Sequence, residues 1–554
     1  MSNKEVRIGV FVCHCGTNIG GVIDCPALTE YARTLPHVVF AQDNLYTCSE
    51  AGLAQIKKGI EEYNLNRVIV ASCSPRTHEP LFRATCQEAG VNPYYFHFVN
   101  IRDQCSWVHM NEPEKATEKA KDLIRMGVAR AFYLQALEKN QVDIDPRALV
   151  IGGGIAGMTV ALNLANRGFP VKLIERKDRL GGLLNDLNKV FPTLDDATKL
   201  LEIKDQVLEH KNITVFTSTM IKDVEGYVGN YNITITKGDE EEQFKVGAII
   251  IATGAEVLEP EGLFGYDGKK VITQLQLEKI LKEKTLDAKN VVMIQCTGAR
   301  TDERPYCSGI CCMVALKNAQ LIKELNPDAQ ITILYRDILT PGTEYEKFYR
   351  DTRAKGILFL KYSPDRPPYV EEDHVRVLNQ FIQKEVQIPA DLVVLSTPLV
   401  AYEDSKNLAQ LLKVPREANG FFLEAHVKLR PVDFATDGVF ICGCAHWPKD
   451  INDTISQALG AASRASTILA HRTLEVEGAV ARVNEELCVG CGICMKLCPY
   501  DAIARTEDGL AHVREVVCKG CGLCGASCPE QAITILHFTN DQILAQIKVL
   551  MEGE

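Results

Sequence analysis

Two copies of one cysteine motif near the carboxyl end constrain the fold of this chain more than any other feature. The segments LCVGCGICMKLCPYDAI and VCKGCGLCGASCPEQAI align over most of their length, 30 positions apart. Each copy has the spacing C-x2-C-x2-C-x3-C-P. Three closely spaced thiolates of this kind wrap one corner of an iron–sulfur cube, while the fourth, held by its proline turn, reaches the other cube. Glycines between the cysteines let the backbone bend around the cube and point N–H groups at its sulfurs.

This spacing is that of a bacterial two-cluster ferredoxin. We therefore predict two [4Fe–4S] clusters whose ligands are exchanged between the copies. The first should take Cys488, Cys491, Cys494 and Cys528, and the second should take Cys518, Cys521, Cys524 and Cys498. A zinc site also uses C-x2-C pairs, but eight cysteines in this doubled spacing favour the clusters.

Composition places the chain among ordinary folded proteins. Its 554 residues are enough for roughly three to four domains of about 150 residues. Apolar residues make up 46% and charged residues 24% of the chain, which excludes disorder and fibrous repeats as its main organisation. The formal net charge of −11 argues against nucleic acid and anionic membrane as partners.

The cysteine usage points to redox chemistry in a reducing compartment. No run of about 18 apolar residues could span a bilayer, and the start MSNKEVRIGV lacks the apolar stretch of a signal peptide. We therefore expect a cytoplasmic protein without an integral membrane segment. Its 21 cysteines then argue for metal ligation and redox chemistry rather than structural disulfides.

We expect an α/β multidomain architecture, because strand-like runs alternate with helical ones along most of the chain. Residues 1–140 should form an α/β iron–sulfur domain that ends in a charged linker helix over 113–139. Residues 141–476 should form an FAD module with two dinucleotide-type subdomains, the second over about 270–395. Residues 477–554 should form the two-cluster ferredoxin domain.

A glycine fingerprint predicts the dinucleotide site. The segment ALVIGGGIAGMTVALNLANRGFPVKLIER places Gly152, Gly154 and Gly157 directly after a strand and at the mouth of a helix. Glycines allow the tight turn and the close approach of a pyrophosphate, and the helix N-terminus adds its positive dipole. Glu175 ends the next strand and would accept hydrogen bonds from the adenosine ribose hydroxyls. A glycine turn without a nucleotide is the alternative.

Three further segments resemble the FAD-binding, two-dinucleotide-domain flavoproteins of the thioredoxin reductase type. They are LGGLL (180–184), IIIATGA (249–255) and ATDGVFICGCA (435–445). The resemblance implies that Asp437 binds the flavin ribityl chain and that the helix over 456–465 faces the isoalloxazine. The predicted FAD-binding residues are Gly152, Gly154, Ile155, Ala156, Gly157, Glu175, Arg176, Gly181, Gly182, Leu183, Ala252, Thr253, Gly254, Asp437, Gly443, Gln457 and Ala458.

The second dinucleotide-type subdomain has lost its own fingerprint. Between the expected strand 290–295 and helix 313–325 the turn reads CTGARTDERPYCSGICC, with Gly298 alone where three spaced glycines belong. This longer loop does not offer the close backbone approach that a phosphate cradle needs. We predict that its four cysteines hold an iron–sulfur cluster where nicotinamide would otherwise sit. The alternatives are a strained disulfide between the adjacent pair, or one buried structural thiol. The four cysteines are Cys296, Cys307, Cys311 and Cys312.

Five N-terminal cysteines each follow one of the expected strands of a parallel sheet. They are Cys13, Cys15, Cys48, Cys73 and Cys105. All would fall on the carboxyl edge of the sheet, where α/β proteins build their sites. We predict another [4Fe–4S] cluster there, with either Cys13 or Cys15 left over as a spare thiol. Buried cysteines at strand ends are the alternative, and Cys25 and Cys86 are interpreted as core or surface thiols.

Long, specific segments along the whole chain support one further interpretation. They are IGVFVCHCGTNIGGVID, CSPRTHEP, NIRDQCSWVH, LGGLLNDLNKVFPTLD, EGYVGNYNITI, QCTGARTDERPYCSGICCMVALKNAQ and the terminal cysteine repeat. On these segments the chain resembles the A-type subunits of heterodisulfide reductase. The resemblance implies an FAD protein that splits electron pairs in a complex with B- and C-type subunits, an electron-input subunit such as a hydrogenase or formate dehydrogenase, and ferredoxin. The resemblance is also compatible with a dimer of the complex. No catalytic residue is predicted here, since substrate chemistry would lie on partner chains.

The chain departs from the longer members of that family in one respect. They carry extra cysteines after the FPTLD segment and an inserted ferredoxin domain after the GYVGN segment. Here the first segment continues as FPTLDDATKL, and NITITKGDEEEQFKVGAIIIATG runs straight on. In this short form one electron exit of the family is absent or replaced, which puts bifurcation itself in question.

Two functions stay open on these residues. The first is an electron-transfer hub with FAD and about four [4Fe–4S] clusters, which bifurcates or confurcates electrons between an input subunit, ferredoxin and a disulfide or other acceptor on partner subunits. The second is an NAD(P)H-dependent FAD and iron–sulfur oxidoreductase that resembles the glutamate synthase small subunit. The cysteines that replace glycines in the second subdomain favour the hub.

Overall fold

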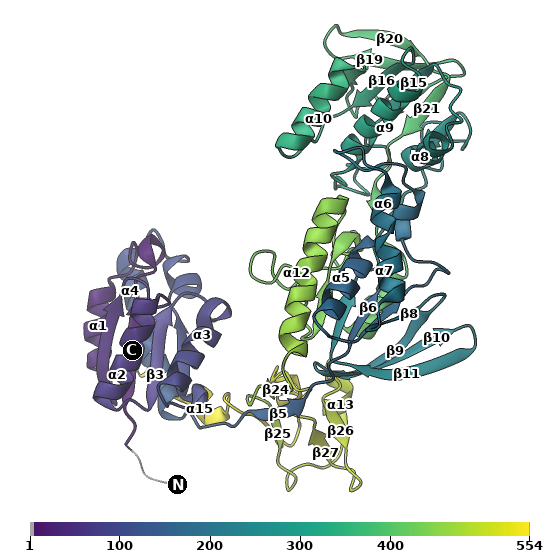
Figure 1. Ribbon diagram of the computed structural model, residues 1–554. Coiled ribbons are helices and arrows are strands. Elements are labelled where there is room, and N and C mark those ends of the chain that lie inside the picture. The colour runs from purple at the N-terminus through teal and green to yellow at the C-terminus, as the bar shows by residue number, and fades with distance from the viewer. Residues whose placement is uncertain (1–4, 553–554) are drawn as a thin grey trace. The chain divides into compact units, whose positions relative to one another are not determined.

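The computed structural model describes residues 5–552 and divides into two compact units (Figure 1). Unit 1 joins Met1–Gln141 to Glu475–Glu554, and unit 2 is Val142–Leu474. The boundaries that we expected, after residues 140 and 476, differ from these divisions by one and two residues. The N-terminal and ferredoxin parts, which we expected as separate domains, both belong to unit 1.

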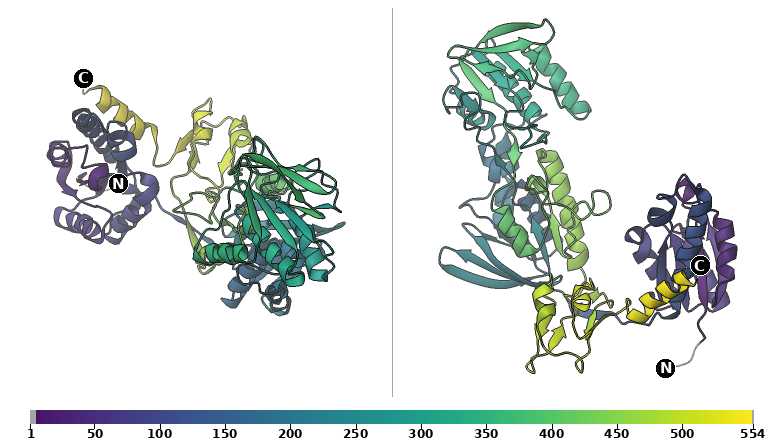
Figure 2. Two further views of the ribbon diagram at one scale, coloured as in Figure 1. Left: turned by 90° about the horizontal axis from the view of Figure 1, so that it is seen from above. Right: turned by 180° about the vertical axis from the view of Figure 1, so that it is seen from behind.

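The N-terminal part of unit 1 is a parallel four-stranded sheet in the order β2-β1-β3-β4, with helices on both faces (Figure 2). Its strands are β1 (Ile8–Cys13), β2 (Val38–Asn44), β3 (Arg67–Ser72) and β4 (Phe96–Asn100). Its helices are α1 (Cys25–Arg33), α2 (Glu50–Tyr63), α3 (Pro75–Glu88) and α4 (Pro113–Phe132). Helices α1 and α4 pack on one face, and α2 and α3 on the other. The linker helix expected over 113–139 is therefore α4, which ends at Phe132 and belongs to this core.

Local sequence explains where these elements begin. The run IGVFVC is buried along its whole length as β1, as a strand covered on both faces requires. Asp24 caps α1 by accepting a hydrogen bond from the amide of Ala27 at 3.0 Å, and Ser49 caps α2 by accepting from the amide of Gly52 at 3.3 Å. Such caps satisfy N–H groups that the first turn of a helix leaves without partners.

The ferredoxin part of unit 1 consists of two short antiparallel pairs and two short helices. The pairs are β25 (Ala481–Val483) with β28 (Ile533–Ile535), and β26 (Ile503–Arg505) with β27 (Ala511–Val513). The helices are α13 (Ile493–Leu497) and α14 (Leu523–Ala526). Its small apolar core includes most of the cysteines of the repeat.

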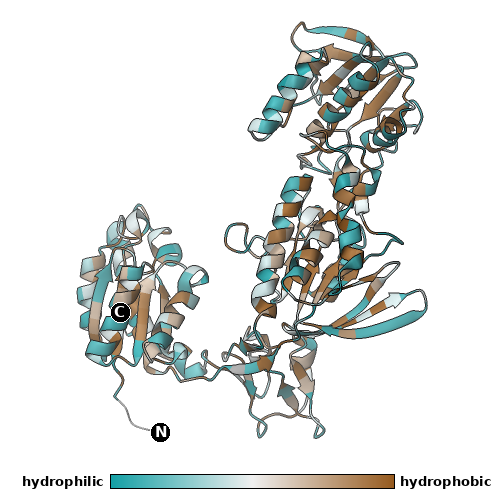
Figure 3. Ribbon diagram, in the orientation of Figure 1, coloured by the Kyte–Doolittle hydropathy of each residue, from teal (hydrophilic) through white to brown (hydrophobic). Residues whose placement is uncertain are grey.

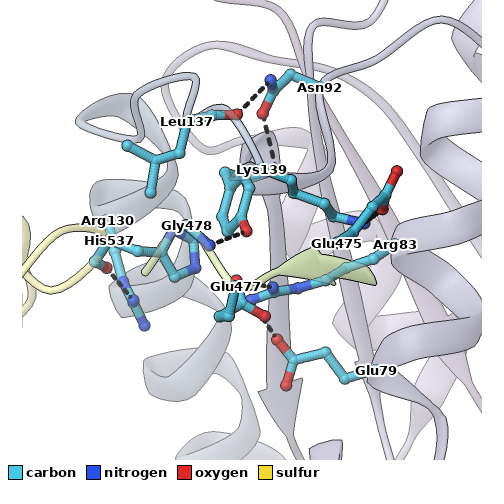
Figure 4. Close-up of polar contacts among 11 residues, drawn as sticks. Glu79, Arg83, Asn92, Arg130, Leu137, Lys139, Glu475, Glu477, Gly478 and His537 are labelled. Atoms are coloured by element: carbon cyan, nitrogen blue, oxygen red, sulfur yellow. Dashed lines mark hydrogen bonds and ion pairs between the residues drawn. The ribbon is translucent and has the colours of Figure 1, made fainter. Parts of the chain in front are cut away.

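Polar contacts join both ends of the ferredoxin part to the N-terminal part of unit 1 (Figure 4). Before the repeat, the amide of Gly478 donates to the hydroxyl of Tyr94 at 2.6 Å. After the repeat, the guanidinium of Arg130 on α4 donates to the carbonyl of His537 at 2.7 Å. The last helix, α15 (Asn540–Met551), packs against α4. These contacts explain why both parts belong to one unit.

Unit 2 begins with a parallel five-stranded sheet in the order β23-β12-β6-β7-β8. Its strands are β6 (Ala148–Ile151), β7 (Val171–Ile174), β8 (Ile213–Phe216), β12 (Ala248–Ile251) and β23 (Val439–Ile441). Helices α5 (Ile155–Asn166) and α12 (Ile451–Leu469) share a core with one face. An antiparallel sheet packs on the other face; its strands are β9 (Met220–Tyr227), β10 (Asn230–Lys237) and β11 (Glu240–Val246). The buried strands are the hydrophobic stretches of Figure 3.

The second subdomain of unit 2 repeats this plan with the parallel order β14-β21-β15-β16-β17. Its strands are β14 (Val271–Thr273), β15 (Asn290–Ile294), β16 (Gln330–Tyr335), β17 (Leu358–Lys361) and β21 (Leu392–Leu395). Helices α8 (Gln274–Glu283), α9 (Cys311–Leu325) and α10 (Thr343–Ala354) pack on one face. The antiparallel strands β18 (Tyr369–Val370), β19 (His374–Asn379) and β20 (Lys384–Pro389) cover the other. No helix within residues 5–552 is long and apolar enough to cross a membrane.

Candidate flavin and iron–sulfur sites

The turn between β6 and α5 is built as the glycine fingerprint predicts. A Cβ on Gly157 would lie 1.8 Å from the carbonyl oxygen of Gly152, so only glycine lets the helix approach the strand this closely. Gly152 itself has φ +111° and packs on the carbonyl of Ala252. At Gly154, in contrast, an added Cβ would meet nothing within 4 Å. That open space beside a helix N-terminus is where a pyrophosphate would bind.

A cavity at the carboxyl edge of the first sheet collects most of the predicted FAD residues. Its lining includes Gly154, Ile155, Ala156, Glu175, Arg176, Gly181, Gly182, Leu183, Ala252, Thr253 and Gly254. A second cavity is lined by Gly152 and again by Glu175, Arg176 and Thr253. The hydroxyl of Thr253 is buried without a hydrogen-bond partner among the described residues. An orphaned buried hydroxyl of this kind fits a ligand that supplies the missing hydrogen bond.

The carboxylate of Glu175 is held in place by the glycine turn. It accepts hydrogen bonds from the amide of Gly153 at 2.7 Å and from the amide of Lys177 at 2.8 Å. Each carboxylate oxygen has a second lone pair, so Glu175 can still accept from a ribose hydroxyl. Beside it, the Arg176 guanidinium stacks over the Tyr402 ring with 3.9 Å to its centroid and pairs with Asp404 at 2.8 Å.

The structure corrects our prediction for Asp437. This residue precedes β23, and a parallel strand carries its site at the other end, where Gly443 and Cys444 lie. Asp437 does not line the flavin cavity, whereas Cys444 does. The carbonyl of Asp437 accepts a hydrogen bond from the Tyr231 hydroxyl at 2.5 Å. Asp437 therefore belongs to the far edge of the sheet.

The helix after β23 begins earlier than expected, and this also changes residue roles. Its first turn, with Ile451 and Thr454, lines the cavity. Gln457 lies one turn further on and accepts a hydrogen bond from the amide of Gly443 at 2.9 Å, so it supports the loop. Ala458 is fully buried in the core under α12. Neither Gln457 nor Ala458 lines the cavity.

The four cysteines of the second subdomain lie together at the end of β15 and the start of α9. Cys296, with φ +60°, follows the strand, and Cys311 and Cys312 open the helix. Burial and the charges of the neighbouring thiols raise the pKa of Cys311, and burial raises that of Cys312 to about 11. The pKa of Cys296 is raised by burial and lowered by Arg300. Cys311 also lines the flavin cavity, so this group of thiols adjoins the predicted flavin.

The ferredoxin repeat forms two cavities, each lined by cysteines from both copies. One is lined by Cys488, Cys491, Cys494 and Cys528. The other is lined by Cys498, Cys518, Cys521 and Cys524. The two exchanged cysteines accept equivalent hydrogen bonds, from the amide of Ala502 to Cys498 Sγ at 3.2 Å and from the amide of Ala532 to Cys528 Sγ at 3.3 Å. The cysteines are thus grouped around two cavities in the same sets of four as in the prediction, and their ligation of clusters stays a prediction.

Four of the five N-terminal cysteines lie together at the carboxyl edge of the first sheet. Burial and the charges of Cys13 and Cys73 raise the pKa of both Cys15 and Cys48. The amide of Thr47 donates to Cys13 Sγ at 3.4 Å. Cys105 is different, because its thiol donates to the carbonyl of Ala116 on α4 at 3.1 Å and is buried in the core under that helix. The structure thus corrects our prediction for Cys105 and leaves both Cys13 and Cys15 in the group.

Two buried donors beside this group have no partner among the described residues. They are the side-chain amide Nδ2 of Asn44 and the hydroxyl of Thr47. Buried polar groups without partners are rare in native proteins, and the sulfurs of an iron–sulfur cluster accept hydrogen bonds. The residues therefore fit a cluster held by Cys13, Cys15, Cys48 and Cys73. Within residues 5–552, no group of three or more His, Cys, Asp or Glu side chains is arranged to hold a single metal ion.

Comparison with known proteins decides the family. Residues 146–294 match the family model for pyridine nucleotide-disulphide oxidoreductases, and residues 481–535 match that for 4Fe-4S dicluster domains. The chain is 40% identical to the A-type subunit of the H(2):CoB-CoM heterodisulfide,ferredoxin reductase of Methanothermobacter thermautotrophicus over 100% of this chain and 98% of that protein. The chain belongs to the heterodisulfide reductase A-subunit family. It is thus an oxidoreductase subunit with an FAD-binding domain and a dicluster domain.

A second relative agrees with this assignment. A protein of Archaeoglobus profundus, named for its likeness to the heterodisulfide reductase A subunit, is 38% identical over 99% of each chain. The alignment to the Methanothermobacter protein spans 651 positions against 554 residues here, so at least 97 positions of that alignment hold no residue of this chain. Among solved structures, the thioredoxin reductase of Lactococcus lactis is 17% identical, with a TM-score of 0.43 over 58% of this chain and 99% of that one.

Four charged residues that line the flavin cavity of this family member were not predicted from the sequence: Lys177, Glu278, Lys449 and Asp450. Lys449 lines the cavity and donates to the carbonyl of Gly443 at 2.8 Å, and burial lowers its pKa. Glu278 also lines the cavity and pairs with Lys317, and both side chains are almost completely buried. Both members of this pair lie on amphipathic helices, where a charged residue is normally solvent-exposed. Of Lys449 and this buried pair, only Lys449 follows a recognisable segment, the GCA turn after β23.

Proposed function

We propose that this chain is the electron-transfer hub of a heterodisulfide-reductase-like complex. One observation carries the proposal: the thiols of Cys296, Cys307, Cys311 and Cys312 replace a nicotinamide-binding turn, and Cys311 lines the flavin cavity itself. A bound FAD exchanges both one and two electrons. A cluster at this place would receive or deliver single electrons next to it.

The number of clusters follows from the groups of thiols. The ferredoxin cavities account for two clusters, and the groups at the flavin cavity and at the N-terminal sheet edge add one each. Bound iron would supply the positive charge that lets the thiols of each group ionise together as ligands. We therefore propose about four [4Fe–4S] clusters and one FAD per chain.

The partners are proposed from the relatives. The Methanothermobacter relative is named as the A-type subunit of a hydrogen-, CoB-CoM heterodisulfide- and ferredoxin-linked reductase, and the Methanococcus maripaludis relative, 36% identical, as its hydrogen- or formate-linked counterpart. We infer that this chain works with B- and C-type subunits, with an electron-input subunit and with ferredoxin. The disulfide or other acceptor would be handled by those partners.

Bifurcation needs two exits of different potential from one flavin. The N-terminal group and the ferredoxin clusters are the two candidate exits on this chain. Since the inserted ferredoxin domain of longer family members is missing here, the terminal ferredoxin part is the candidate for the low-potential exchange. We infer that the complex couples a favourable electron transfer to the reduction of ferredoxin.

The test of this coupling is stoichiometry in the purified native complex. Ferredoxin reduction is measured with and without the high-potential acceptor. Coupling requires that ferredoxin reduction stops when the acceptor is left out and that one ferredoxin electron accompanies each acceptor electron. If the two half-reactions proceed independently, the chain is a simple electron relay and does not bifurcate.

The alternative function has one observation in its favour. Residues 146–294 match a family model of pyridine nucleotide-linked enzymes, so an NAD(P)H-dependent reductase that resembles the glutamate synthase small subunit stays a second candidate. The loop between β15 and α9 argues against it, because it replaces the expected glycines with cysteines.

A further inference from the structure

Arg102 is held in a defined position beside the N-terminal thiols. It opens the turn Arg102–Ser106 that follows β4, and its Nε donates to the Asp103 carboxylate at 3.0 Å. Its guanidinium lies 4.6 Å from the centroid of the Trp107 ring. The side-chain oxygen of Asn100 accepts from the amides of both Arg102 and Asp103, at 3.1 and 3.0 Å. This cation is therefore fixed by its own turn.

Strand register places this turn beside the thiols, because Asn100 at the end of β4 pairs with Ser72, the residue before Cys73. The positive charge of Arg102 acts on the thiols of both Cys15 and Cys73. These are two of the four cysteines that the structure gathers at this sheet edge. The Arg102 side chain is 19% exposed, so solvent screens its charge less than that of a surface arginine.

A cation fixed beside a cluster changes the midpoint potential of that cluster. When the oxidised cluster takes up one electron and no proton, its net charge becomes more negative by one. A positive charge held in a partly buried site stabilises the reduced form more than the oxidised form. Hydrogen bonds to cluster sulfurs act in the same direction and are among the factors that set cluster potentials. The structure supplies such donors in Asn44 and Thr47.

We propose that Arg102 is a positioning residue that raises the midpoint potential of the N-terminal cluster and thereby makes the N-terminal domain the higher-potential exit. This inference rests on the proposed function, since it requires that Cys13, Cys15, Cys48 and Cys73 hold a cluster. It assigns a role to an arginine outside the ligand set.

The test is an EPR-monitored redox titration of the full chain, purified without oxygen. Cys73→Ser first identifies the signal of the N-terminal cluster by removing it. Arg102→Gln should then retain its iron and shift the midpoint potential of that signal to more negative values, with the ferredoxin signals unchanged. Arg102→Lys keeps the charge but loses the planar contact with Asp103, and should give a smaller shift.

A matched control exists in the same domain. Arg125 on α4 pairs with Asp122 at 2.7 Å, and its side chain is 22% exposed, close to the value for Arg102. Arg125→Gln should leave every midpoint potential unchanged. A wild-type potential in Arg102→Gln would overturn the proposal, as would loss of iron in that variant together with a wild-type potential in Arg102→Lys. If Cys73→Ser removes no iron or signal, the proposed N-terminal cluster itself fails, which is a different result.

Discussion

At the residue scale, Cys498 and Cys528 carry the organisation of the ferredoxin part. Each belongs by sequence to one copy of the repeat, and each lines the cavity of the other copy. Each also accepts a backbone hydrogen bond through its sulfur from the alanine four residues later.

Removing Cys528 should therefore destabilise the cluster of the first copy. We expect Cys528→Ser to lose about four irons per chain, and we expect the double variant with Cys488→Ser to lose no more than that. The double variant with Cys518→Ser should lose roughly twice as much. Iron and acid-labile sulfide content of anaerobic protein measures this. If the double variant with Cys528→Ser and Cys518→Ser loses no more iron than either single variant, the predicted exchange of ligands between the copies is wrong.

The glycine turn of the flavin site gives a second prediction. In Gly157→Ala the added Cβ would meet the Gly152 carbonyl at 1.8 Å, so α5 must move away from β6 and FAD binding should fall by at least about tenfold, which corresponds to about 1.4 kcal/mol. The control is Gly460→Ala in α12, where a Cβ meets only Val432 at 3.9 Å. That variant should keep its flavin and gain up to about 1 kcal/mol of helix stability. Flavin content and thermal unfolding test both, and equal flavin in the two variants would contradict the site.

Residue roles were predictable where neighbouring residues alone determine them. The predicted roles of the fingerprint glycines and the eight ferredoxin cysteines rest on local spacing, and the structure shows a close helix–strand approach at Gly157 and two cavities lined by four cysteines each. Our predictions for Asp437 and Cys105 were wrong. The role of Asp437 depends on which end of its strand faces the site, and that of Cys105 depends on where its side chain points. Cys105 follows its strand as expected, yet the tight turn directs its thiol toward α4.

At the element scale, the segment between β15 and α9 decides between a nicotinamide site and a cluster. Cys296→Ser should lose about four irons per chain while the FAD stays bound, because the glycine turn of the flavin site belongs to another sheet. Cys86→Ser is the matched control, since Cys86 is a fully buried thiol in the apolar core of the N-terminal domain. Iron content and flavin content are measured together. Unchanged iron in Cys296→Ser would exclude a cluster at this loop.

The docking of α15 on α4 should depend on pH. Burial, together with the charges of Arg130 and Arg83, lowers the pKa of His537 to about 3, against about 6.5 in an unfolded chain. Between these values the opened state binds a proton that the docked state does not, so docking is stable above about pH 6.5 and weakens as the pH falls. At pH 5 the loss is about 2 kcal/mol, or roughly a 30-fold loss of protection.

Hydrogen exchange of the α15 amides at pH 5 and pH 7, corrected for intrinsic exchange rates, measures this docking. His537→Asn should abolish most of the pH dependence, because the asparagine side chain does not titrate in this range. Asparagine also tolerates the φ of +69° at this position. Equal protection of the wild-type helix at the two pH values would show that His537 does not control docking.

At the scale of the whole molecule, the union of the N-terminal and ferredoxin parts is the feature that the sequence did not predict. The bond from Gly478 to Tyr94 joins residues 384 positions apart, and that from Arg130 to His537 joins residues 407 apart. No local pattern marks such pairs, since each consists of a tyrosine, an arginine or a backbone group with no distinguishing neighbour. The order and type of the domains were predictable because strands, helices and cysteine spacings are local features.

In the proposed function, the flavin exchanges electrons with iron–sulfur centres and not with nicotinamide. The most direct test is an anaerobic titration of the holo chain, with the flavin absorbance followed in the visible range. Reduced ferredoxin should bleach the flavin rapidly, and NADH and NADPH should leave it oxidised over the same time. Rapid bleaching by either nicotinamide, with no response to reduced ferredoxin, would contradict the hub and support the NAD(P)H-dependent reductase.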